Sequence, residues 1–505
     1  MASRNYVIRT HKSRRAASSF AALFLLLASL VPFVGRVEAQ QVGPPENPYG
    51  VNVFLHKEVE PWKIEQTLRM VSEANIAWIK QEFPWQEIEF KKGYFFDDKW
   101  QKSSWEKFDQ IVDLADKYHL KVIARVDHAP DWAKSGAGGN KPLKDYKDLA
   151  DFANAMLDHY KGRIQYVQVW NEPNLAGEWV PGTPVDPEGY VEMLKVVYPA
   201  IKAAHSDAVV LSAPMAMTLE GPQLRGNMNE IDYWNGMYQA GVKGFFDIAS
   251  ANGYGLDQPP DAAPDPKVLN FRRVELIRDV MVKNGDGERP IWFDEYAWNA
   301  SPDTLAQEER DFWRHVTPQQ QADWTVQGID YARKNWPWAG VISVWYFRQV
   351  GDIPPERAEY YFAMVNPDFS AQPVYEAVKG AAAAFPGPAS QPAGTPINPP
   401  PSPTSETVST PQPSVRPEAE TPALPTASTD AGPTPTGALA SAPTLAPPET
   451  ATVSGTVLTS TPGPGTLGGT SGGTNTILYI IGGVLVVGGL AGLGYYFVRN
   501  RAKDH

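Results

Sequence analysis

The chain has 505 residues, a formal net charge of −12 at pH 7 and no cysteine. The lack of cysteine excludes disulfides, a thiol nucleophile, a cysteine-bound metal and a lipidated cysteine. The acidic balance argues against a nucleic-acid partner, because phosphates require a basic surface.

The first 39 residues have the features of a secretory signal peptide. Five basic residues precede an apolar stretch, residues 20–34, and small residues follow at "VEA" before Gln40. This order of basic, apolar and small residues is typical of an export signal, so we expect cleavage after residue 39. Two alternatives remain open: a twin-arginine signal at Arg14-Arg15, and an uncleaved N-terminal anchor.

Residues 40–385 are expected to form the folded domain, since all 16 tryptophans lie between Trp62 and Trp345. Short apolar runs alternate there with amphipathic segments. The predicted strands lie near Gly50–Phe54, Ala77–Gln81, Lys121–Val126, Ile164–Trp170, Val209–Ser212, Phe246–Ala251, Pro290–Glu295 and Val341–Tyr346. The predicted helices are Ile64–Glu73, Trp105–Tyr118, Leu149–Tyr160, Tyr190–Ala204, Ile231–Gly241, Val268–Val282, Gln319–Arg333 and Val374–Ala383.

Eight strands, each followed by a helix, predict an α/β fold. We expect a closed (β/α)8 TIM barrel more than an open doubly wound sheet. The helix at residues 231–241 is the weakest element, because it is assigned mainly to complete the pattern.

Two glutamates lie at the carboxyl ends of predicted strands. Glu172 follows the fourth strand in "VQVWNEPN", where Pro173 disfavours a helical Glu172, and Glu295 closes the seventh strand in "PIWFDEYAW". Strands four and seven face each other across a barrel, and the loops at this end build the active site. Glu172 alone is also consistent with a capping residue, but its pairing with Glu295 favours a functional site.

Two carboxyl groups at a barrel mouth suit glycoside hydrolysis. One group must be protonated in order to donate to the leaving oxygen, and the other must be ionised to attack or stabilise the anomeric carbon. Burial and the neighbouring negative charge are expected to raise the pKa of the acid partner.

Three segments carry a resemblance to a known group of enzymes: "WNEP", "WQEIEFKKGYF" at residues 85–95 and "YYFAMVNPDFSAQPVYEAVKG" near the domain's end. The chain resembles the clan A retaining glycoside hydrolases, most closely families 5 and 39, over nearly all of residues 48–385. The resemblance implies that Glu172 is the acid/base and Glu295 the nucleophile.

The same resemblance implies further binding residues. Asn171 is expected to hydrogen-bond the sugar 2-hydroxyl, Tyr254 to hydrogen-bond Glu295, and Trp345 to form an aromatic floor under the sugar. Arg125 and His128, in "ARVDHAPDW", match positions where clan members often bind sugar. Packing alternatives stay open for three of these residues: a packed loop for Tyr254, the core for Trp345 and a structural histidine for His128.

The chain departs from the clan pattern at two positions. Asn252 replaces a histidine that many relatives carry, and Lys80, a candidate substrate-binding residue, replaces an arginine that often ends the second strand. Asp294 is a rival to Glu295. Strict alternation along a strand directs only one of them into the mouth, and the resemblance favours Glu295.

No metal and no cofactor are expected. The sequence has no HExxH, and "DQPPDAAPD" at residues 257–265 has prolines where a calcium loop needs glycine and ligand carbonyls.

The C-terminal part is of another kind. Residues 386–476 are almost entirely Pro, Thr, Ser, Ala and Gly, which predicts a disordered linker. The uncharged apolar run 477–498 predicts a transmembrane helix, with a core helix as the alternative, and three basic residues in 499–505 predict a cytoplasmic tail. Gly488 and Gly492 form a GxxxG pair that is weak evidence for helix pairing.

These features together predict an extracellular, membrane-anchored retaining β-glycosidase that acts on an oligo- or polysaccharide. Beyond that saccharide and the membrane, no partner is indicated. Two alternatives stay open: a non-catalytic glycan-binding or envelope protein on a similar barrel, and a transglycosylase that uses the same residues.

Overall fold

The computed structural model describes residues 42–136, 140–221, 226–351 and 353–388. The predicted signal peptide, the linker from residue 389 onward, the predicted transmembrane helix and the predicted tail lie outside these residues. Within the described ranges, no helix is both long enough and apolar enough to cross a membrane.

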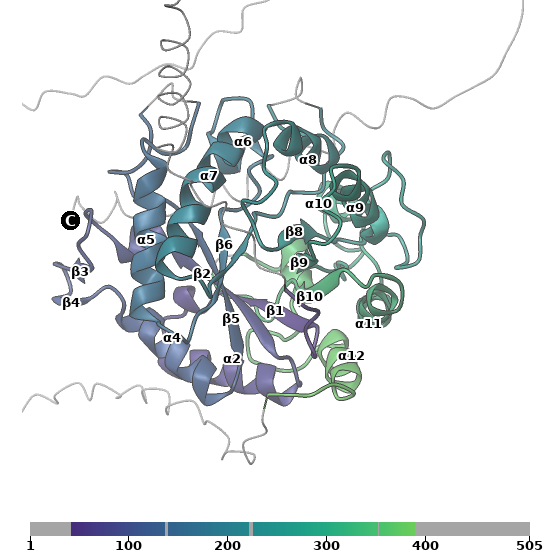
Figure 1. Ribbon diagram of the computed structural model, residues 1–505. Coiled ribbons are helices and arrows are strands. Elements are labelled where there is room, and N and C mark those ends of the chain that lie inside the picture. The colour runs from purple at the N-terminus through teal and green to yellow at the C-terminus, as the bar shows by residue number, and fades with distance from the viewer. Residues whose placement is uncertain (1–41, 137–139, 222–225, 352, 389–505) are drawn as a thin grey trace, which may run out of the picture. The chain divides into compact units, whose positions relative to one another are not determined.

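A barrel of parallel strands forms the centre of the described chain (Figure 1). Its sheet has eight strands in the order β7-β6-β5-β2-β1-β10-β9-β8. A parallel bridge between Leu211 and Ile248 joins the two ends of this order, so the barrel is nearly closed. The strands are β1 (Tyr49–Val53), β2 (Trp78–Pro84), β5 (Lys121–Asp127), β6 (Tyr166–Val169), β7 (Val209–Leu211), β8 (Ala249–Asn252), β9 (Ile291–Tyr296) and β10 (Ala339–Val344).

One long helix follows each of these strands, and the helices surround the barrel (Figure 1). They are α2 (Pro61–Glu73), α4 (Glu106–Lys117), α5 (Tyr146–His159), α7 (Pro187–Ala204), α8 (Glu230–Gln239), α9 (Val274–Lys283), α11 (Pro318–Asn335) and α12 (Pro373–Ala382). The predicted TIM barrel is confirmed. The helix expected at residues 231–241 is present as α8, which begins at an Asn229 cap whose side chain accepts from the Asp232 N–H.

Several short elements lie between these units and were not predicted. They are η1 (Leu55–Lys57), α3 (Trp85–Ile88), β3 (Phe96–Asp97), β4 (Lys102–Ser103), α6 (Ala176–Trp179), η2 (Phe271–Arg273), α10 (Gln307–Trp313) and η3 (Ala358–Phe362). They are too short to show a helix or strand period in the sequence. Among them, α6 directly follows the "WNEPN" segment and is part of the barrel mouth.

Aromatic rings fill one level of the barrel interior. Trp78, Tyr166 and Trp292 come from strands that are not neighbours in the sheet, yet their ring centroids lie 4.9–5.2 Å apart. Rings that meet across the barrel must point inward. Inward residues recur at every second position of a strand, so counting on from these rings identifies the inward residues nearer the carboxyl ends. These residues are polar: Lys80 and Glu82, Arg125 and Asp127, Gln168, and Asp294.

The second barrel strand is longer than predicted, and this changes the position of Lys80. The strand was expected to end at Gln81, but β2 continues to Pro84 and pairs along its whole length with β5. Lys80 is therefore in the strand interior and not at its end. Arg125 likewise precedes the end of β5, which is Asp127.

Candidate active site

The loop after β6 holds Glu172 in an uncommon backbone conformation. Trp170 and Glu172 have φ angles of +74° and +35°, which non-glycine residues seldom adopt and which cost free energy. Asn174 anchors the loop, because its side chain accepts from the Ala216 N–H at 2.8 Å and donates to the Ala216 and Met228 carbonyls at 2.9 and 2.8 Å. The fixed loop therefore determines where the Glu172 carboxyl group points.

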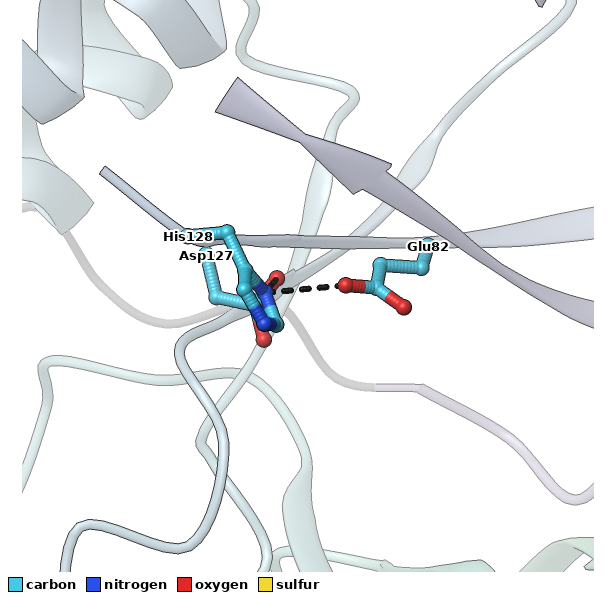
Figure 2. A group of neighbouring side chains, drawn as sticks. All are labelled: Glu82, Asp127 and His128. Atoms are coloured by element: carbon cyan, nitrogen blue, oxygen red, sulfur yellow. Dashed lines mark hydrogen bonds and ion pairs between the residues drawn. The ribbon is translucent and has the colours of Figure 1, made fainter. Parts of the chain in front are cut away.

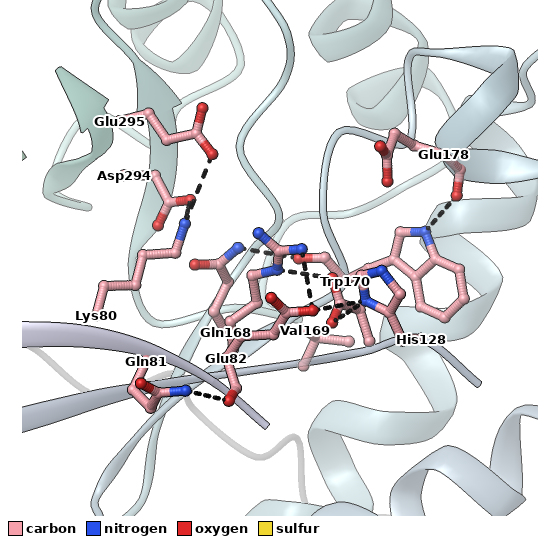
Figure 3. A network of polar contacts seen from close by, with 12 residues as sticks. Lys80, Gln81, Glu82, His128, Gln168, Val169, Trp170, Glu178, Asp294 and Glu295 are labelled. Carbon is pink, nitrogen blue, oxygen red and sulfur yellow. Dashed lines mark hydrogen bonds and ion pairs between the residues drawn. The ribbon is translucent and has the colours of Figure 1, made fainter. Parts of the chain in front are cut away.

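A bulge in β9 brings two consecutive carboxylates inward. Where β9 pairs with β8, Ala251 is opposite Phe293, so regular pairing would place Asn252 opposite Asp294. Asn252 is instead opposite Glu295. The Lys80 ammonium pairs with Asp294, and its Nζ lies 3.9 Å from Glu295 Oε1 (Figure 3). The expectation that only one of the two acids enters the barrel was wrong. A bulge adds a residue to one strand and so breaks the strict alternation on which that expectation was based.

One amide nitrogen contacts both glutamates. Asn252 Nδ2 donates to Glu172 Oε1 at 2.7 Å and, more weakly, to Glu295 Oε2 at 3.4 Å. These two oxygens can be no further apart than the sum of the two distances, about 6.1 Å. The strands thus bring together two carboxyl groups that are 123 positions apart in the sequence.

The surroundings of the two glutamates give their carboxyl groups different pKa values. Burial and then the charge of Glu295 raise the pKa of the Glu172 carboxyl well above its usual value. Burial also raises the pKa of Glu295, with Asp294 adding to this, but Lys80 and the Tyr254 hydroxyl lower it. A proton shared by the pair therefore resides on Glu172, and Glu295 carries the charge.

Tyr254 and Trp345 lie at this end of the barrel. The Tyr254 hydroxyl donates to Glu295 Oε2 at 2.8 Å, and burial raises the pKa of this phenol well above its usual value, so it keeps its proton. Trp345 directly follows β10, is partly buried and packs edge-on against Phe54 with ring centroids 5.3 Å apart. Tyr254 is thus in contact with Glu295, and Trp345 is only partly buried.

Of the other predicted residues, Asn171 is buried and Arg125 and His128 belong to an ion-paired group. Arg125 Nε donates to Asp127 Oδ2 at 2.6 Å, and His128 Nδ1 lies 2.8 Å from both Asp127 Oδ1 and Glu82 Oε1. Desolvation opposes protonation of His128, but the carboxylates of Asp127 and Glu82 outweigh it and raise its pKa well above the usual value. His128 is therefore a cation beside two anions, and 44% of its side chain is exposed.

Glu82, Asp127 and His128 converge closely enough to hold a metal ion, as Figure 2 shows. Their ligand atoms lie within 4.8 Å of one another. The donor set is already neutralised, because the Arg125 guanidinium and the His128 ring pair with the two carboxylates. We therefore interpret the group as an ion-paired network next to the glutamates.

Sequence reasoning did not assign functions to four residues near this site: Asn252, Glu82, Asp127 and Glu178. Asn252 was noted only as a departure from the clan pattern. Glu82 and Asp127 lie near or at the carboxyl ends of β2 and β5, so the search for acids at strand ends that found Glu172 would also have found them. Glu178 lies on α6, a short helix that the sequence does not predict.

Comparison of the sequence with known protein families and with curated proteins finds no match. Comparison of the structure with solved structures finds glycoside hydrolases. A family 39 glycoside hydrolase from Bacteroides cellulosilyticus WH2 has a TM-score of 0.50 and 21% identity, over 67% of this chain and 64% of that chain. A GH5_18 protein from Streptomyces cattleya, in complex with Manβ1-4GlcNAc, also has a TM-score of 0.50, with 14% identity over 68% and 82% of the two chains.

The chain has the fold of glycoside hydrolases. Both solved structures come from the families that its motifs resemble, 39 and 5, so the resemblance is confirmed at the level of the fold. The chain spans just under two thirds of the family 39 protein's length. At these identities the likeness concerns the barrel, and the chemistry is argued from the residues.

Proposed function

We propose that this chain is a retaining β-glycosidase that hydrolyses O-glycosidic bonds of an oligo- or polysaccharide. The observation that carries the proposal is the Asn252 amide nitrogen in contact with both Glu172 and Glu295. It limits one pair of carboxyl oxygens to about 6.1 Å. Retaining enzymes have carboxyl groups about 5–5.5 Å apart, whereas inverting enzymes need about 6.5–9.5 Å to admit a water molecule.

The mechanism assigns one step to each carboxyl group. Glu172 donates its proton to the glycosidic oxygen while Glu295 attacks the anomeric carbon, so that the leaving sugar departs and a glycosyl-enzyme ester forms. Glu172, now ionised, takes a proton from water, and that water attacks the same carbon and releases Glu295. The two inversions retain the configuration.

The electrostatic surroundings support Glu172 as the general acid and Glu295 as the nucleophile. A general acid must hold its proton near neutral pH, and the pKa of Glu172 is raised well above its usual value by burial and by Glu295. A nucleophile must be ionised, and Lys80 and Tyr254 act in that direction on Glu295. Asn171 is proposed to bind the sugar 2-hydroxyl, and Trp345 to pack under the sugar ring.

Turnover of a panel of aryl β-glycosides and insoluble glycans, β-mannosides included, tests the proposal. We expect at least one substrate to be hydrolysed and Glu295→Ala to abolish its hydrolysis. Glu188→Ala, at an exposed position on α7, is the matched control and should retain full activity. Binding of a glycan without turnover, unchanged by Glu295→Ala, would instead support a non-catalytic glycan-binding protein.

We also propose that the barrel is held outside the cell by the C-terminal segment. The support is the sequence alone: the export signal, the proline- and threonine-rich residues 386–476 and the apolar run 477–498 followed by basic residues. Protease treatment of intact cells should release an active barrel fragment into the medium. Full protection of the barrel until the cells are lysed would contradict this location.

A further inference from the structure

Two buried asparagines, Asn252 and the residue before Glu172, Asn171, each have an amide oxygen without a hydrogen-bond partner in the described part of the chain. Asn171 and Asn252 are 6% and 3% exposed. An unpaired buried acceptor is destabilising, so such an atom indicates a place where a bound molecule can supply a donor. The Asn252 amide already contacts both carboxylates through its nitrogen, so its oxygen lies in the same site.

A third carboxyl group, Glu178, lies on α6, the short helix that follows the loop with Glu172. It is partly exposed, and within the described residues its side chain has no hydrogen bond and no ion pair. Figure 3 shows its carboxylate turned away from the indole of Trp170, whose Nε1 donates to the Glu178 backbone carbonyl at 3.1 Å. The Glu178 charge acts on Glu172, whose pKa it helps to raise after burial and Glu295.

The charges around the pair do not balance. The cations Lys80, Arg125 and His128 are each paired with carboxylates already described. Against these three cations stand five carboxyl groups besides the protonated Glu172, namely Glu82, Asp127, Glu178, Asp294 and Glu295. Burial raises the pKa of Glu178, and the charges of His128 and Arg125 lower it. The mouth is therefore rich in hydrogen-bond acceptors and negative charge. Its most exposed cation, His128, already forms ion pairs with Glu82 and Asp127.

We propose that Glu178 selects the substrate by charge, so that the position next to Glu172 accepts neutral or amino sugars and rejects uronic acids. This inference rests on the proposed function, because it concerns the sugar on the leaving side of the same site. A hydroxyl or ammonium group of that sugar can donate to the Glu178 carboxylate. A sugar carboxylate would meet acceptors and like charge there, which opposes its binding.

The test measures binding, so that it does not depend on catalysis. A panel of neutral β-disaccharides is titrated calorimetrically against the full chain carrying Glu295→Gln. The tightest binder is then prepared in two further forms, in which the hydroxymethyl group of the reducing sugar becomes a carboxylate or an aminomethyl group. The three compounds are titrated at pH 6 against Glu295→Gln alone and combined with Glu178→Gln.

We expect the carboxylate form to bind at least about tenfold more weakly than the neutral form, and Glu178→Gln to reduce this ratio by about tenfold. The aminomethyl form should bind the Glu295→Gln chain more tightly than the neutral form does. This difference should disappear when Glu178→Gln is added. Glu188→Gln, at an exposed position outside the mouth, is the matched control and should leave the ratios unchanged. Glu178→Ala serves as a second variant if Glu178→Gln alters the fold, which circular dichroism would detect.

Equal binding of the carboxylate and neutral forms to the Glu295→Gln chain would overturn the inference. So would a ratio that persists after both Glu178 substitutions. Turnover by the unmodified chain tests the proposed function separately. An inactive chain that still discriminates by charge would refute the glycosidase and leave the selectivity intact.

Discussion

Glu172 and Glu295 are held so close together that a single amide nitrogen, on Asn252, donates hydrogen bonds to both. The contacts have unequal lengths, 2.7 and 3.4 Å, so the amide mainly positions Glu172. Many clan members are expected to carry a histidine at this position. An asparagine makes the contact without adding a group that titrates near neutral pH.

Asn252→Ala should therefore lower kcat by about 10²-fold, a loss similar to that measured when one preorganised hydrogen-bond donor is removed from other active sites. Steady-state kinetics on the best substrate of the panel measures the effect. Asn335→Ala is the control, because that amide is exposed and donates only to a helix carbonyl. Unchanged kcat in Asn252→Ala would show that the bridge does not matter for catalysis.

Tyr254→Phe should shift the pH profile of kcat/KM. The Tyr254 hydroxyl lowers the pKa of Glu295, so its removal raises that pKa, and the nucleophile becomes protonated at higher pH. The acidic limb of the profile should move to higher pH. Tyr118→Phe removes a similar bond to Glu65 near the surface and should leave the limb in place. A shift to lower pH, or none, contradicts the assigned contact.

Lys80→Met should strongly destabilise the fold, since it leaves Asp294 buried without its cation. Breaking a buried ion pair typically costs about 3–5 kcal/mol, and chemical denaturation measures the loss. Adding Asp294→Asn should recover part of it. Lys334→Met, which removes an exposed pair with Asp330, should cost about 1 kcal/mol or less. Equal losses for the two single substitutions would contradict a structural function of Lys80.

Glu172→Gln should make the chain more stable at pH 8. In the folded state the pKa of Glu172 is raised well above 4.5, so folding favours the proton, and stability falls as pH rises from about 4.5 through the folded-state pKa. Glutamine has no charge to bury, so the gain should exceed the ~0.5 kcal/mol typical of surface substitutions and shrink toward pH 4.

Thermal unfolding at the two pH values measures this gain, with Glu188→Gln as the control. A gain that is larger at pH 4 than at pH 8 would mean that the pKa of Glu172 is lowered by folding.

Most of the barrel could be predicted because its strands are apolar runs with polar boundaries. "KVIARV" and "GVISVWYF" correspond to β5 and β10 within a few residues. The end of a barrel strand is harder to predict where the inward residues are polar. The predicted second strand stops at Gln81, but Glu82 also belongs to β2. An inward polar residue near the mouth looks like a loop residue in the sequence.

The candidate site was predictable only in part, for a related reason. Glu172 and Glu295 could be found because each ends an apolar strand. The bulge at Asp294 depends on the register between β9 and its neighbours. That register cannot be inferred from the alternation of residues along one strand. The Asn252 bridge likewise joins residues 80 and 43 positions away, so only the folded barrel reveals it.

The most direct test of the central claim is to trap the glycosyl-enzyme. The chain is incubated with a panel of activated 2-deoxy-2-fluoro β-glycosides, digested, and analysed by peptide mass spectrometry. We predict that one sugar adds to the peptide containing Glu295, and that Glu295→Gln prevents the labelling. A label on another residue, or hydrolysis of the natural linkage with inverted configuration and no label, would contradict the account.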